Sequence, residues 1–470
     1  MSDEIKFTKE QQDAINHNGN QLLVKGIAGS GKTLVLLKSA IDLAIKNSSE
    51  KVGVFSFSKS LSAAAEAMLK KHKLKNLNIT TFHQWAANAY RKTYGHHPTY
   101  ANEYYLMNVA MREMKVLYPK HRFFKDDTFN KFLQEEIKWL KGRNIQSNAE
   151  YLATSRKGRG SKIRLSESDR TVIYGLYSLY EVKKDGAYDY EDTALQLIKD
   201  QHKIVDAVKY DHVIIDEAQD FNKVTMQLLV GIAQQSCRIG ADIGQKIFPT
   251  TFTWKETGLD FRGNRVKTLQ QSFRSTKQII ELARSIQSND EITKDEEFTL
   301  PIVPTVSGPI PQVYVCKTQK AQDEAIIELL KTIVQSDSKG SIGVIVRNWD
   351  SATRLERKLL AKGIPFTEIG DTRKLKRDFD VAQGLHTEPG IKFTTFYTSK
   401  GLEFKYVVVV DLVNPSSSEL LGEEFDWDLE RRLLYVGMTR AKVALSICTY
   451  DEKAKLLSEL DSNLYSKVSL

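Results

Sequence analysis

The apolar positions of this chain alternate between short continuous runs and longer stretches with helical spacing. Short apolar runs bounded by turn residues are typical of strands buried on both faces, and helical spacing indicates helices packed on them. The runs predict strands at Leu22–Val24, His212–Ile215, Ser236–Gly240, Val266–Leu269, Gln312–Cys316, Ile342–Val346, Tyr406–Leu412 and Val443–Ile447. The spacing predicts helices near Ala321–Val334, Ser351–Ala361 and Leu429–Val436. The pattern therefore predicts an α/β fold with two mostly parallel sheets.

A glycine-rich segment follows the first predicted strand and opens onto a helical stretch. It reads Gly-Ile-Ala-Gly-Ser-Gly-Lys-Thr from Gly26 to Thr33. Glycines let the backbone curl until its N–H groups point at phosphate oxygens, and the helix N-terminus adds its dipole. Lys32 would reach the β- and γ-phosphates, and the Thr33 hydroxyl suits Mg²⁺. The segment predicts a nucleotide site, with an ordinary glycine turn as the alternative.

A second nucleotide signal lies at Asp216 and Glu217, where the predicted strand His212–Ile215 ends. Asp216 can hold Mg²⁺ through water, and Glu217 can orient or deprotonate an attacking water. The alternative is an acidic helix start, which suits the helix dipole. Lys32 and Asp216 are further apart than one simple α/β sheet requires, so we expect an insertion between them.

Residues 96–204 fit such an insertion, because they carry mostly amphipathic helical patterns, as at Phe129–Leu140 and Thr171–Val182. We therefore expect a first α/β domain at 1–95 and 205–268, interrupted by a helical insertion at 96–204. A second α/β domain begins at 269.

Two such domains with a single phosphate loop predict a nucleotide held between them, with cations supplied by the second domain. Arg274 and Arg440 are the candidates. A guanidinium there would stabilise charge on the transferring phosphoryl group. The alternative for any single arginine is a surface salt bridge.

Composition narrows the class of protein. The 470 residues allow about three domains. The three cysteines form no CxxC pair, which argues against a disulfide framework or a zinc site and favours a cytoplasmic setting. No apolar run approaches a membrane span, and the N-terminus lacks the apolar core of a signal peptide. A net charge of +9 weakly favours a polyanionic partner.

Taken together, these segments resemble superfamily 1 helicases of the UvrD/Rep type, whose motifs they match in order over nearly the whole chain. Phe7–Gln12 is similar to the family's glutamine motif, which implies that Gln11 reads the adenine edge. Phe55–Leu61 and Thr80–His83 resemble motifs that touch single-stranded DNA. Asp216–Asp220 is similar to the DExQD signature.

The later motifs complete the resemblance. Asp242–Gln245 matches the DxxQ segment, in which Gln245 would sense the γ-phosphate. Phe273–Ser275 resembles the motif whose aromatic ring stacks on the base and whose arginine contacts phosphate. Thr395–Phe404 and Glu430–Ala441 resemble the last two motifs. The resemblance implies two RecA-like domains in tandem, with ATP and Mg²⁺ as cofactors.

The residues expected to act at the nucleotide follow from these matches. The expected catalytic residues are Lys32, Glu217, Gln245, Arg274 and Arg440. The expected metal ligands are Thr33 and Asp216. The expected nucleotide-binding residues are Gln11, Gly26, Ala28, Gly29, Ser30, Gly31, Lys32, Thr33, Phe273, Arg274, Gly401, Glu403 and Arg440.

Nucleic-acid contacts are expected at side chains from both domains and from a basic segment, Ser155–Arg164, in the insertion. They are Phe57, Ser58, Thr81, His83, Phe252, Trp254, Thr395, Tyr397, Arg156, Lys157 and Arg159. Each aromatic ring has core filling as its alternative, and the basic segment has a solvated loop. A second basic cluster lies at Arg373–Arg377.

The chain departs from the family pattern at several positions. Ala241 stands where the family usually has glycine, and Tyr397 where it often has histidine. The family's base-stacking aromatic would fall near Thr250, so Phe252 or Trp254 is expected to replace it. The family's long second insertion is reduced to about 367–389, which leaves 269–366 and 390–470 as the second domain.

The resemblance implies an ATP-driven motor that moves 3′ to 5′ on single-stranded DNA and unwinds duplex at junctions. An alternative is a nucleic-acid-gated ATPase that serves as a sensor or regulatory subunit of a larger complex, with little unwinding of its own. The reduced second insertion motivates that alternative. An RNA substrate is a third, weaker, hypothesis.

Overall fold

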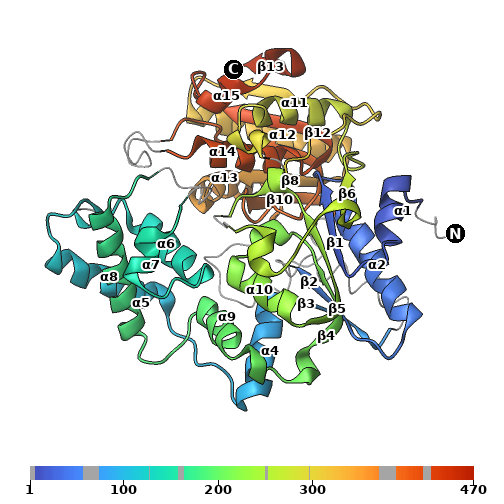
Figure 1. Cartoon of the computed structure of the whole chain (residues 1–470). Coiled ribbons are helices and arrows are strands. Elements are labelled where there is room, and N and C mark those ends of the chain that lie inside the picture. Colours follow the sequence, from blue (N-terminus) through green and yellow to red (C-terminus); the bar gives the residue numbers. More distant parts are fainter. Residues whose placement is uncertain are drawn as a thin grey trace.

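The computed structural model describes residues 6–56, 74–125, 127–156, 163–248, 252–295, 297–369, 388–415 and 425–470. Two sheet-based domains pack on each other, and a helical part lies beside them (Figure 1). We call these the first domain, the second domain and the insertion. Within the described ranges, every helix is too short or too polar to cross a lipid bilayer.

A parallel sheet with the strand order β3-β2-β4-β5-β1-β6 forms the first domain. Its strands are β1 Gln21–Gly26, β2 Val52–Ser56, β3 Leu77–Thr81, β4 Tyr210–Ile215, β5 Ala233–Ala241 and β6 Val266–Leu269. The carboxyl ends of parallel strands meet at one edge of a sheet, where ligands bind in open α/β folds. The loop after β1, the carboxylates after β4 and Asp242 after β5 therefore share that edge.

Helices cover both faces of this sheet. One face carries α1 Lys9–Ile15 and α2 Lys32–Lys46, and the other carries α4 Phe82–Tyr94, α9 Tyr190–Lys199 and α10 Lys223–Gly231. Successive strand side chains point to opposite faces. Accordingly, Leu22 and Val24 of β1 join the core under α2, whereas Leu23 joins the core under α4.

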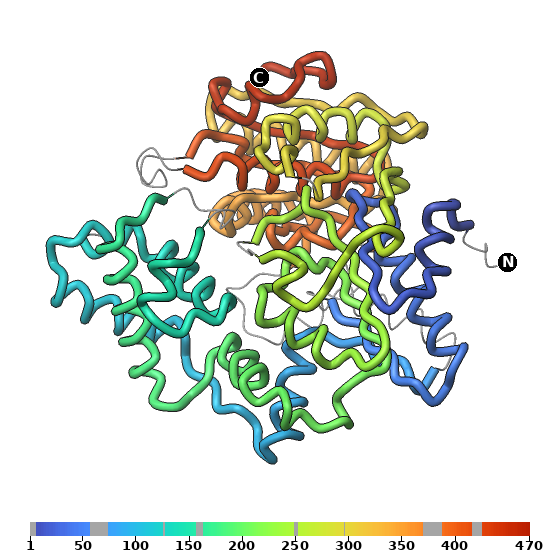
Figure 2. Tube along the Cα trace, in the orientation of Figure 1, coloured from blue at the N-terminus to red at the C-terminus, as the bar shows by residue number. Residues whose placement is uncertain are grey.

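The insertion has an apolar core of its own. Its helices are α5 Glu103–Leu117, α6 Asn130–Gly142, α7 Asn148–Ala153 and α8 Glu167–Lys183. Core side chains run from Met107 to Tyr180. Helix α9 falls in the predicted range 96–204, yet its Ala194 and Leu197 belong to the core of the first domain. The segments that enter and leave the insertion lie side by side, where Tyr100 and Tyr188 form a β-bridge (Figure 2).

The second domain is built on another parallel sheet, in the order β13-β7-β12-β11-β8-β10-β9. Its strands are β7 Gln312–Val315, β8 Ser341–Val346, β9 Phe366–Glu368, β10 Gly390–Thr395, β11 Phe404–Val409, β12 Ala441–Thr449 and β13 Ser466–Ser469. Its helices are α11 Lys277–Gln287, α12 Gln319–Ser336, α13 Trp349–Ala361, α14 Trp427–Met438 and α15 Lys455–Glu459. Ile247, from the first domain, is buried in the core formed by α11 and α14.

The predicted fold class is confirmed, and every predicted strand and helix lies within an observed element or overlaps it. Strands β2, β3, β10 and β13 were not predicted, and the strand-like segment Ile364–Phe366 reaches only the start of β9. Strand β13 is a short edge strand with mostly exposed side chains, so it lacks an apolar run. Most of the predicted reduced insertion, 367–389, lies outside the described residues, as does the Arg373–Arg377 cluster.

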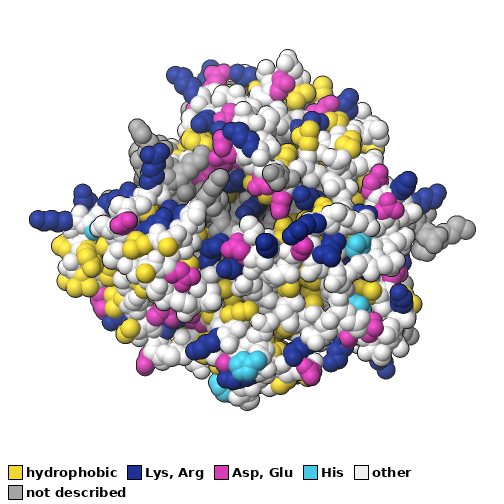
Figure 3. Space-filling model, in the orientation of Figure 1, with side chains coloured by type: hydrophobic (Ala, Val, Ile, Leu, Met, Phe, Trp, Pro, Cys, Tyr) yellow, Lys and Arg dark blue, Asp and Glu magenta, His cyan; other side chains and the backbone are white. Residues whose placement is uncertain are grey.

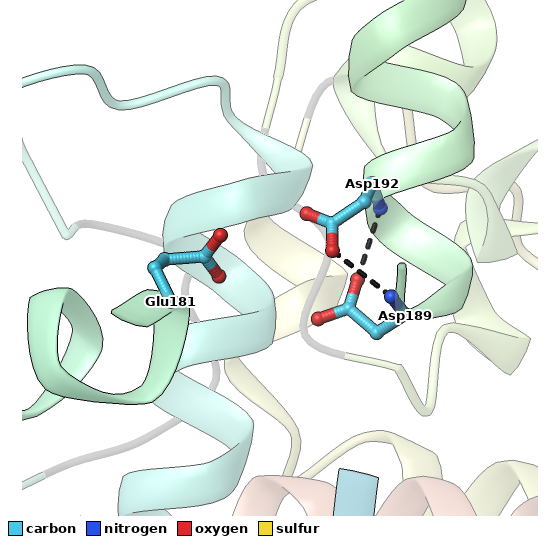
Figure 4. A group of neighbouring side chains, drawn as sticks. All are labelled: Glu181, Asp189 and Asp192. Atoms are coloured by element: carbon cyan, nitrogen blue, oxygen red, sulfur yellow. Dashed lines mark hydrogen bonds between the residues drawn. The ribbon is translucent and has the colours of Figure 1, made fainter. Parts of the chain in front are cut away.

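Three carboxylates of the insertion, Glu181, Asp189 and Asp192, lie close together (Figure 4). The buried ammonium of Lys141 is 2.8 Å from Glu181 and 2.6 Å from Asp192, and it also contacts Asp189. Lys184 forms ion pairs with the same three acids. Burial would raise the pKa of Asp189, but the two lysines outweigh it and lower the pKa to about 2. Ammonium groups thus take the place of a metal ion, and the network ties α6 and α8 to α9.

Replacing Lys141 should loosen the insertion. Lys141 is 1% exposed, and Lys141→Ala leaves Lys184 to offset the charges of three neighbouring carboxylates, of which Asp189 is buried. We expect the free energy of opening measured by hydrogen exchange at the α6, α8 and α9 amides to fall by about 2–4 kcal/mol. The exposed Lys131 on the same helix provides the control, and Lys131→Ala should change protection by less than about 0.5 kcal/mol. Equal protection in both variants would show that the network contributes no stability.

Candidate nucleotide site and nucleic-acid interface

The glycine-rich loop turns sharply between β1 and α2. Gly29 and Gly31 have φ values of +74° and +83°, which favour glycine. A Cβ on Gly29 would lie 2.6 Å from Cβ of Arg274, so the second domain packs directly on the loop. Lys32 is buried, and its ammonium donates to the carbonyls of Gly26 and Ile27 at 2.9 and 3.0 Å. The loop thus presents its lysine at the edge where the two domains meet.

The predicted adenine-reading residue contacts this loop. Gln11 Nε2 donates to the Ser30 carbonyl at 3.0 Å, while Gln11 Oε1 accepts from the backbone N–H of Thr8. Ala28 and Ser30 are buried beside it. The hydroxyls of Ser30 and Ser272 are buried without a hydrogen-bond partner among the described residues. Such orphaned donors are unusual in a folded protein unless a further group binds there.

A buried pair of carboxylates follows β4. Thr33 Oγ1 donates to Asp216 Oδ2 at 2.6 Å, which joins the two predicted metal ligands. Burial and the neighbouring Glu217 raise the pKa of Asp216 to about 6. Burial would also raise the pKa of Glu217, but Lys400 and Lys32 outweigh it and hold the pKa below its ordinary value. Glu217 is therefore kept ionised. Its backbone lies in the left-handed region, with φ at +52°.

The second domain reaches the first through a buried arginine. Arg440 is 1% exposed, and its guanidinium donates to Gln245 Oε1 at 2.7 Å across the seam between the domains. It also donates to the carbonyls of Val436 and Leu402. Burial, and then the neighbouring Arg274, lower the pKa of Arg440 to about 9. Gln245 in turn donates to Asp242, so the DxxQ segment and the last motif form one network.

The other predicted arginine lies at the same seam. Arg274 Nε donates to Glu403 Oε2 at 3.0 Å, which brings two predicted nucleotide-binding residues together. The backbone N–H of Phe273 donates to the Gly29 carbonyl at 2.9 Å, and the Phe273 ring is exposed. Gly401 begins the turn before Glu403 with φ at +81°. The structure thus brings the predicted nucleotide residues of both domains to one place.

Two further residues of this seam were not predicted from the sequence. Lys400 donates to Asp220 Oδ1 and to the Gln245 carbonyl, each at 2.7 Å. Burial raises the pKa of Asp220 to about 7, although the Lys400 charge opposes that shift. The signal was present, because Lys400 and Asp220 both fall within matched motifs.

Arg238 is a third residue that the sequence analysis missed. This buried arginine of β5 donates to the His17 carbonyl at 2.7 Å and to Ser39 of α2. It also donates to the Ile15 carbonyl, at the C-terminal end of α1. A cation at that end of a helix stabilises its unpaired carbonyls. Arg238 thus anchors the helix that carries Gln11, and a charge inside an apolar strand pattern was the available signal.

Two aromatic rings from different domains meet at the seam. Tyr397 and Phe248 have ring centroids 6.0 Å apart, and both are partly buried against the core of the second domain. Tyr397 was predicted. Phe248 was missed, although an aromatic residue three positions after Gln245 was visible in the sequence.

The two predicted replacements for the stacking aromatic lie elsewhere. Phe252 and Trp254 form an edge-to-face pair with centroids 5.4 Å apart, partly buried against the core of the first domain. Core filling explains these contacts, as it explains those of Phe248 and Tyr397, and DNA contact at all four rings stays a prediction.

The remaining predicted contacts lie at strand ends or on exposed helix turns. Thr81 ends β3 and caps α4, where it accepts from the backbone N–H of Gln84. His83 is exposed on the first turn of α4. Thr395 ends β10 and its hydroxyl lies 2.9 Å from that of Thr398.

Arg156 requires a correction. Its guanidinium pairs with Glu136 through two hydrogen bonds of 2.8 Å and donates to the Ile163 carbonyl. The side chain is almost fully buried, so it closes the insertion core rather than facing phosphate. The prediction took the cations of Ser155–Arg164 as a group that faces phosphate, whereas the Arg156 side chain turns inward to Glu136. Phe57, Ser58, Lys157 and Arg159 lie outside the described residues.

Surface charge alone does not mark a nucleic-acid path. On the face shown in Figure 3, Lys and Arg side chains are distributed over all three parts, with acidic side chains among them. The seam between the domains therefore carries the functional inference.

Comparison with known proteins agrees with this geometry. The UvrD/REP helicase N-terminal domain family matches residues 7–255, and the UvrD-like helicase C-terminal domain family matches 267–379 and 379–452. The chain is 25% identical over 414 residues to the ATP-dependent DNA helicase srs2 of Schizosaccharomyces pombe, covering 80% of this chain and 45% of that protein.

Two bacterial relatives show similar likeness. A probable DNA helicase II homolog of Mycoplasma capricolum is 24% identical over 381 residues, covering 74% of this chain and 50% of that protein. Another, of Rickettsia felis, is 24% identical over 401 residues, covering 78% and 58%. The chain thus spans about half the length of the curated relatives it matches.

The family match extends over more than half of the chain, and the two parallel sheets are those of tandem RecA-like domains. The chain belongs to the UvrD/Rep helicase family.

Proposed function

We propose that this chain is an ATP-dependent motor that translocates 3′ to 5′ on single-stranded DNA and unwinds duplex at junctions. The observation that carries the proposal is the bond between Arg440 of the second domain and Gln245 of the first, at 2.7 Å. An arginine supplied across a domain seam to a phosphate site is the arrangement by which nucleotide hydrolysis drives domain motion.

The loop residues fit a triphosphate. The buried hydroxyls of Ser30 and Ser272, which lack partners among the described residues, lie on the two sides of the Gly29 turn. Lys32 donates to two loop carbonyls and forms a buried ion pair with Asp242 at 3.5 Å, so phosphate oxygens would take the place of partners that already hold its charge at the loop. Phe273 offers its exposed ring to a base, and Gln11 offers its amide.

The carboxylate pair fits a magnesium ion. Thr33 and Asp216 supply hard oxygen donors at hydrogen-bond distance from each other, and Mg²⁺ prefers such ligands. The raised pKa of Asp216 records a buried negative charge that a cation would stabilise. When bound, the ion would neutralise charge on the β- and γ-phosphates.

The chain's own groups supply the rest of the chemistry. Glu217, held ionised by Lys400 and Lys32, would orient and deprotonate the attacking water. Arg440 and Arg274 would stabilise charge on the transferring phosphoryl group. The Gln245 side chain accepts from Arg440, and its backbone carbonyl accepts from Lys400. Loss of phosphate contacts would therefore change the hydrogen bonds that join the two domains.

Nucleic-acid movement would follow from this closure. Phe248 and Tyr397 come from different domains and meet at the seam. Opening and closing the seam would change their separation, and rings of this kind grip bases without regard to sequence. The direction of movement and the preference for junctions rest on the family resemblance. The cytoplasmic setting rests on cysteine usage, and the three cysteines are free and buried.

Glu217→Gln should abolish turnover while leaving the fold intact. We expect ATP hydrolysis with single-stranded DNA to fall by about 100-fold or more, because the general base is lost. The rate of ATP hydrolysis by Lys32→Ala should fall to a similar extent, because the contacts of the ammonium with phosphate are lost. Full ATPase activity in either variant would contradict the site assignment.

The same variant completes the test of unwinding. Wild-type chain with ATP should displace a strand from a forked duplex with a 3′ tail, and should fail on a 5′ tail. Glu217→Gln should displace neither. ATP hydrolysis without displacement on any fork would instead indicate a motor or sensor that does not unwind duplex.

Arg238→Ala should weaken ATP binding without slowing the chemical step. Without the hydrogen bonds from Arg238 to its C-terminal end, α1 would no longer hold Gln11 against the loop. The KM for ATP should therefore rise by about 5- to 30-fold. The value of kcat should change by less than about twofold. Arg238→Lys, which keeps a charge, should recover part of the affinity. A fall in kcat with unchanged KM would contradict the positioning role.

A further inference from the structure

The Tyr190 ring contacts two other aromatic rings at the border between the first domain and the insertion. The Tyr190 ring lies 5.3 Å from the His83 ring and 5.2 Å from the Tyr100 ring, between centroids. They come from α4, from the start of α9 and from the segment that enters the insertion. We call His83, Tyr190 and Tyr100 the aromatic track.

The track is exposed and rigidly held. Tyr190 is 45% exposed, Tyr100 is 43% exposed, and His83 is exposed as well. Backbone hydrogen bonds pair the two segments around Tyr100: Ala101 N–H donates to the Tyr188 carbonyl, and Tyr188 N–H donates to the Thr99 carbonyl, each at 2.8 Å. Exposed rings fixed in this way bind a ligand without a large ordering cost.

Helix α6 connects the track to the seam between the domains. Lys138 of α6 forms an ion pair with Glu103 at 3.3 Å, and Glu103 accepts from the backbone N–H of Tyr190 in the track. Burial, and then the charges of Glu430 and of Glu135 on α6, raise the pKa of Tyr397. Residues three apart in a helix lie on the same face. One face of α6 therefore runs from the pair Phe248–Tyr397 toward the track, which places both aromatic sets along the same side of the insertion.

We propose that the aromatic track is a second base-stacking surface, which binds single-stranded DNA beyond the segment gripped by the motor. The proposal rests on the proposed function and extends it to the insertion. The rings are tilted by 58° and 38° against one another, so each exposed ring offers its own face to an unpaired base, and such stacking tolerates any sequence. A lone surface tyrosine needs no ligand, but three touching rings from separate segments make a continuous apolar surface.

The charges around the track indicate how it would bind. Glu103 lies 3.3 Å from Lys138, so these two charges offset each other. Burial raises the pKa of Glu191 to about 7, which reduces its negative charge near neutral pH. With so little net positive charge, the track would add affinity through stacking and not through phosphate contacts. Its loss should therefore leave the salt dependence of DNA binding unchanged.

The test compares short and long oligothymidylates on the full chain by fluorescence anisotropy. Tyr190→Ala should bind an oligomer of about 24 nucleotides about 5- to 100-fold more weakly than wild type. An oligomer of about 8 nucleotides, gripped at the seam alone, should bind equally well to both. The slope of log affinity against log salt should not change. Tyr190→Phe, which keeps the ring, should bind like wild type.

Tyr118→Ala is the matched control. Tyr118 is 44% exposed and caps the far end of α5, about 20 Å along that helix from its start. It should bind both oligomers like wild type. The proposal is overturned if Tyr190→Ala keeps full affinity for the long oligomer, loses affinity equally on both lengths, or flattens the salt slope. If wild type binds neither oligomer, the proposed function itself fails, which is a distinguishable result.

Discussion

The contact on which the rest of this structure depends is the bond from Arg440 to Gln245 across the domain seam. A buried guanidinium is stable only where carbonyl or carboxylate groups satisfy its donors. Val436 and Leu402 supply carbonyls on its own side, and Gln245 supplies the acceptor from the opposite domain. The seam is therefore a polar junction that can exchange partners, and a triphosphate is a stronger partner than an amide.

The architecture makes this junction possible. Both sheets are parallel, so the loops after β1, β4 and β5 emerge at one edge of the first sheet, and β10 brings Thr395 to the edge of the second. Ile247 is buried in the core of the second domain, although it follows the DxxQ segment of the first. Packing thus couples the DxxQ segment to the neighbouring domain, whereas the insertion is joined to the first domain through the ion network of Lys141.

The parts of this picture that were predictable depend on local sequence. Apolar runs define buried strands, and a phosphate loop needs its glycines wherever it occurs. Contacts between segments that are distant in the sequence could not be predicted in the same way. Arg156 looked like one of several loop cations, and only the fold shows that Glu136 lies beside it. Arg238 and Phe248 were visible as residues, but their partners, the end of α1 and Tyr397, are set by tertiary packing.

The central claim is that an arginine of one domain completes a phosphate site held by the other. The direct measurement is nucleotide binding and single-turnover hydrolysis by Arg440→Lys and Arg440→Ala, in the presence of single-stranded DNA. The account predicts that both variants bind ATP within about threefold of wild type, while Arg440→Ala hydrolyses it about 1,000-fold more slowly. Hydrolysis at the wild-type rate in Arg440→Ala would contradict the claim.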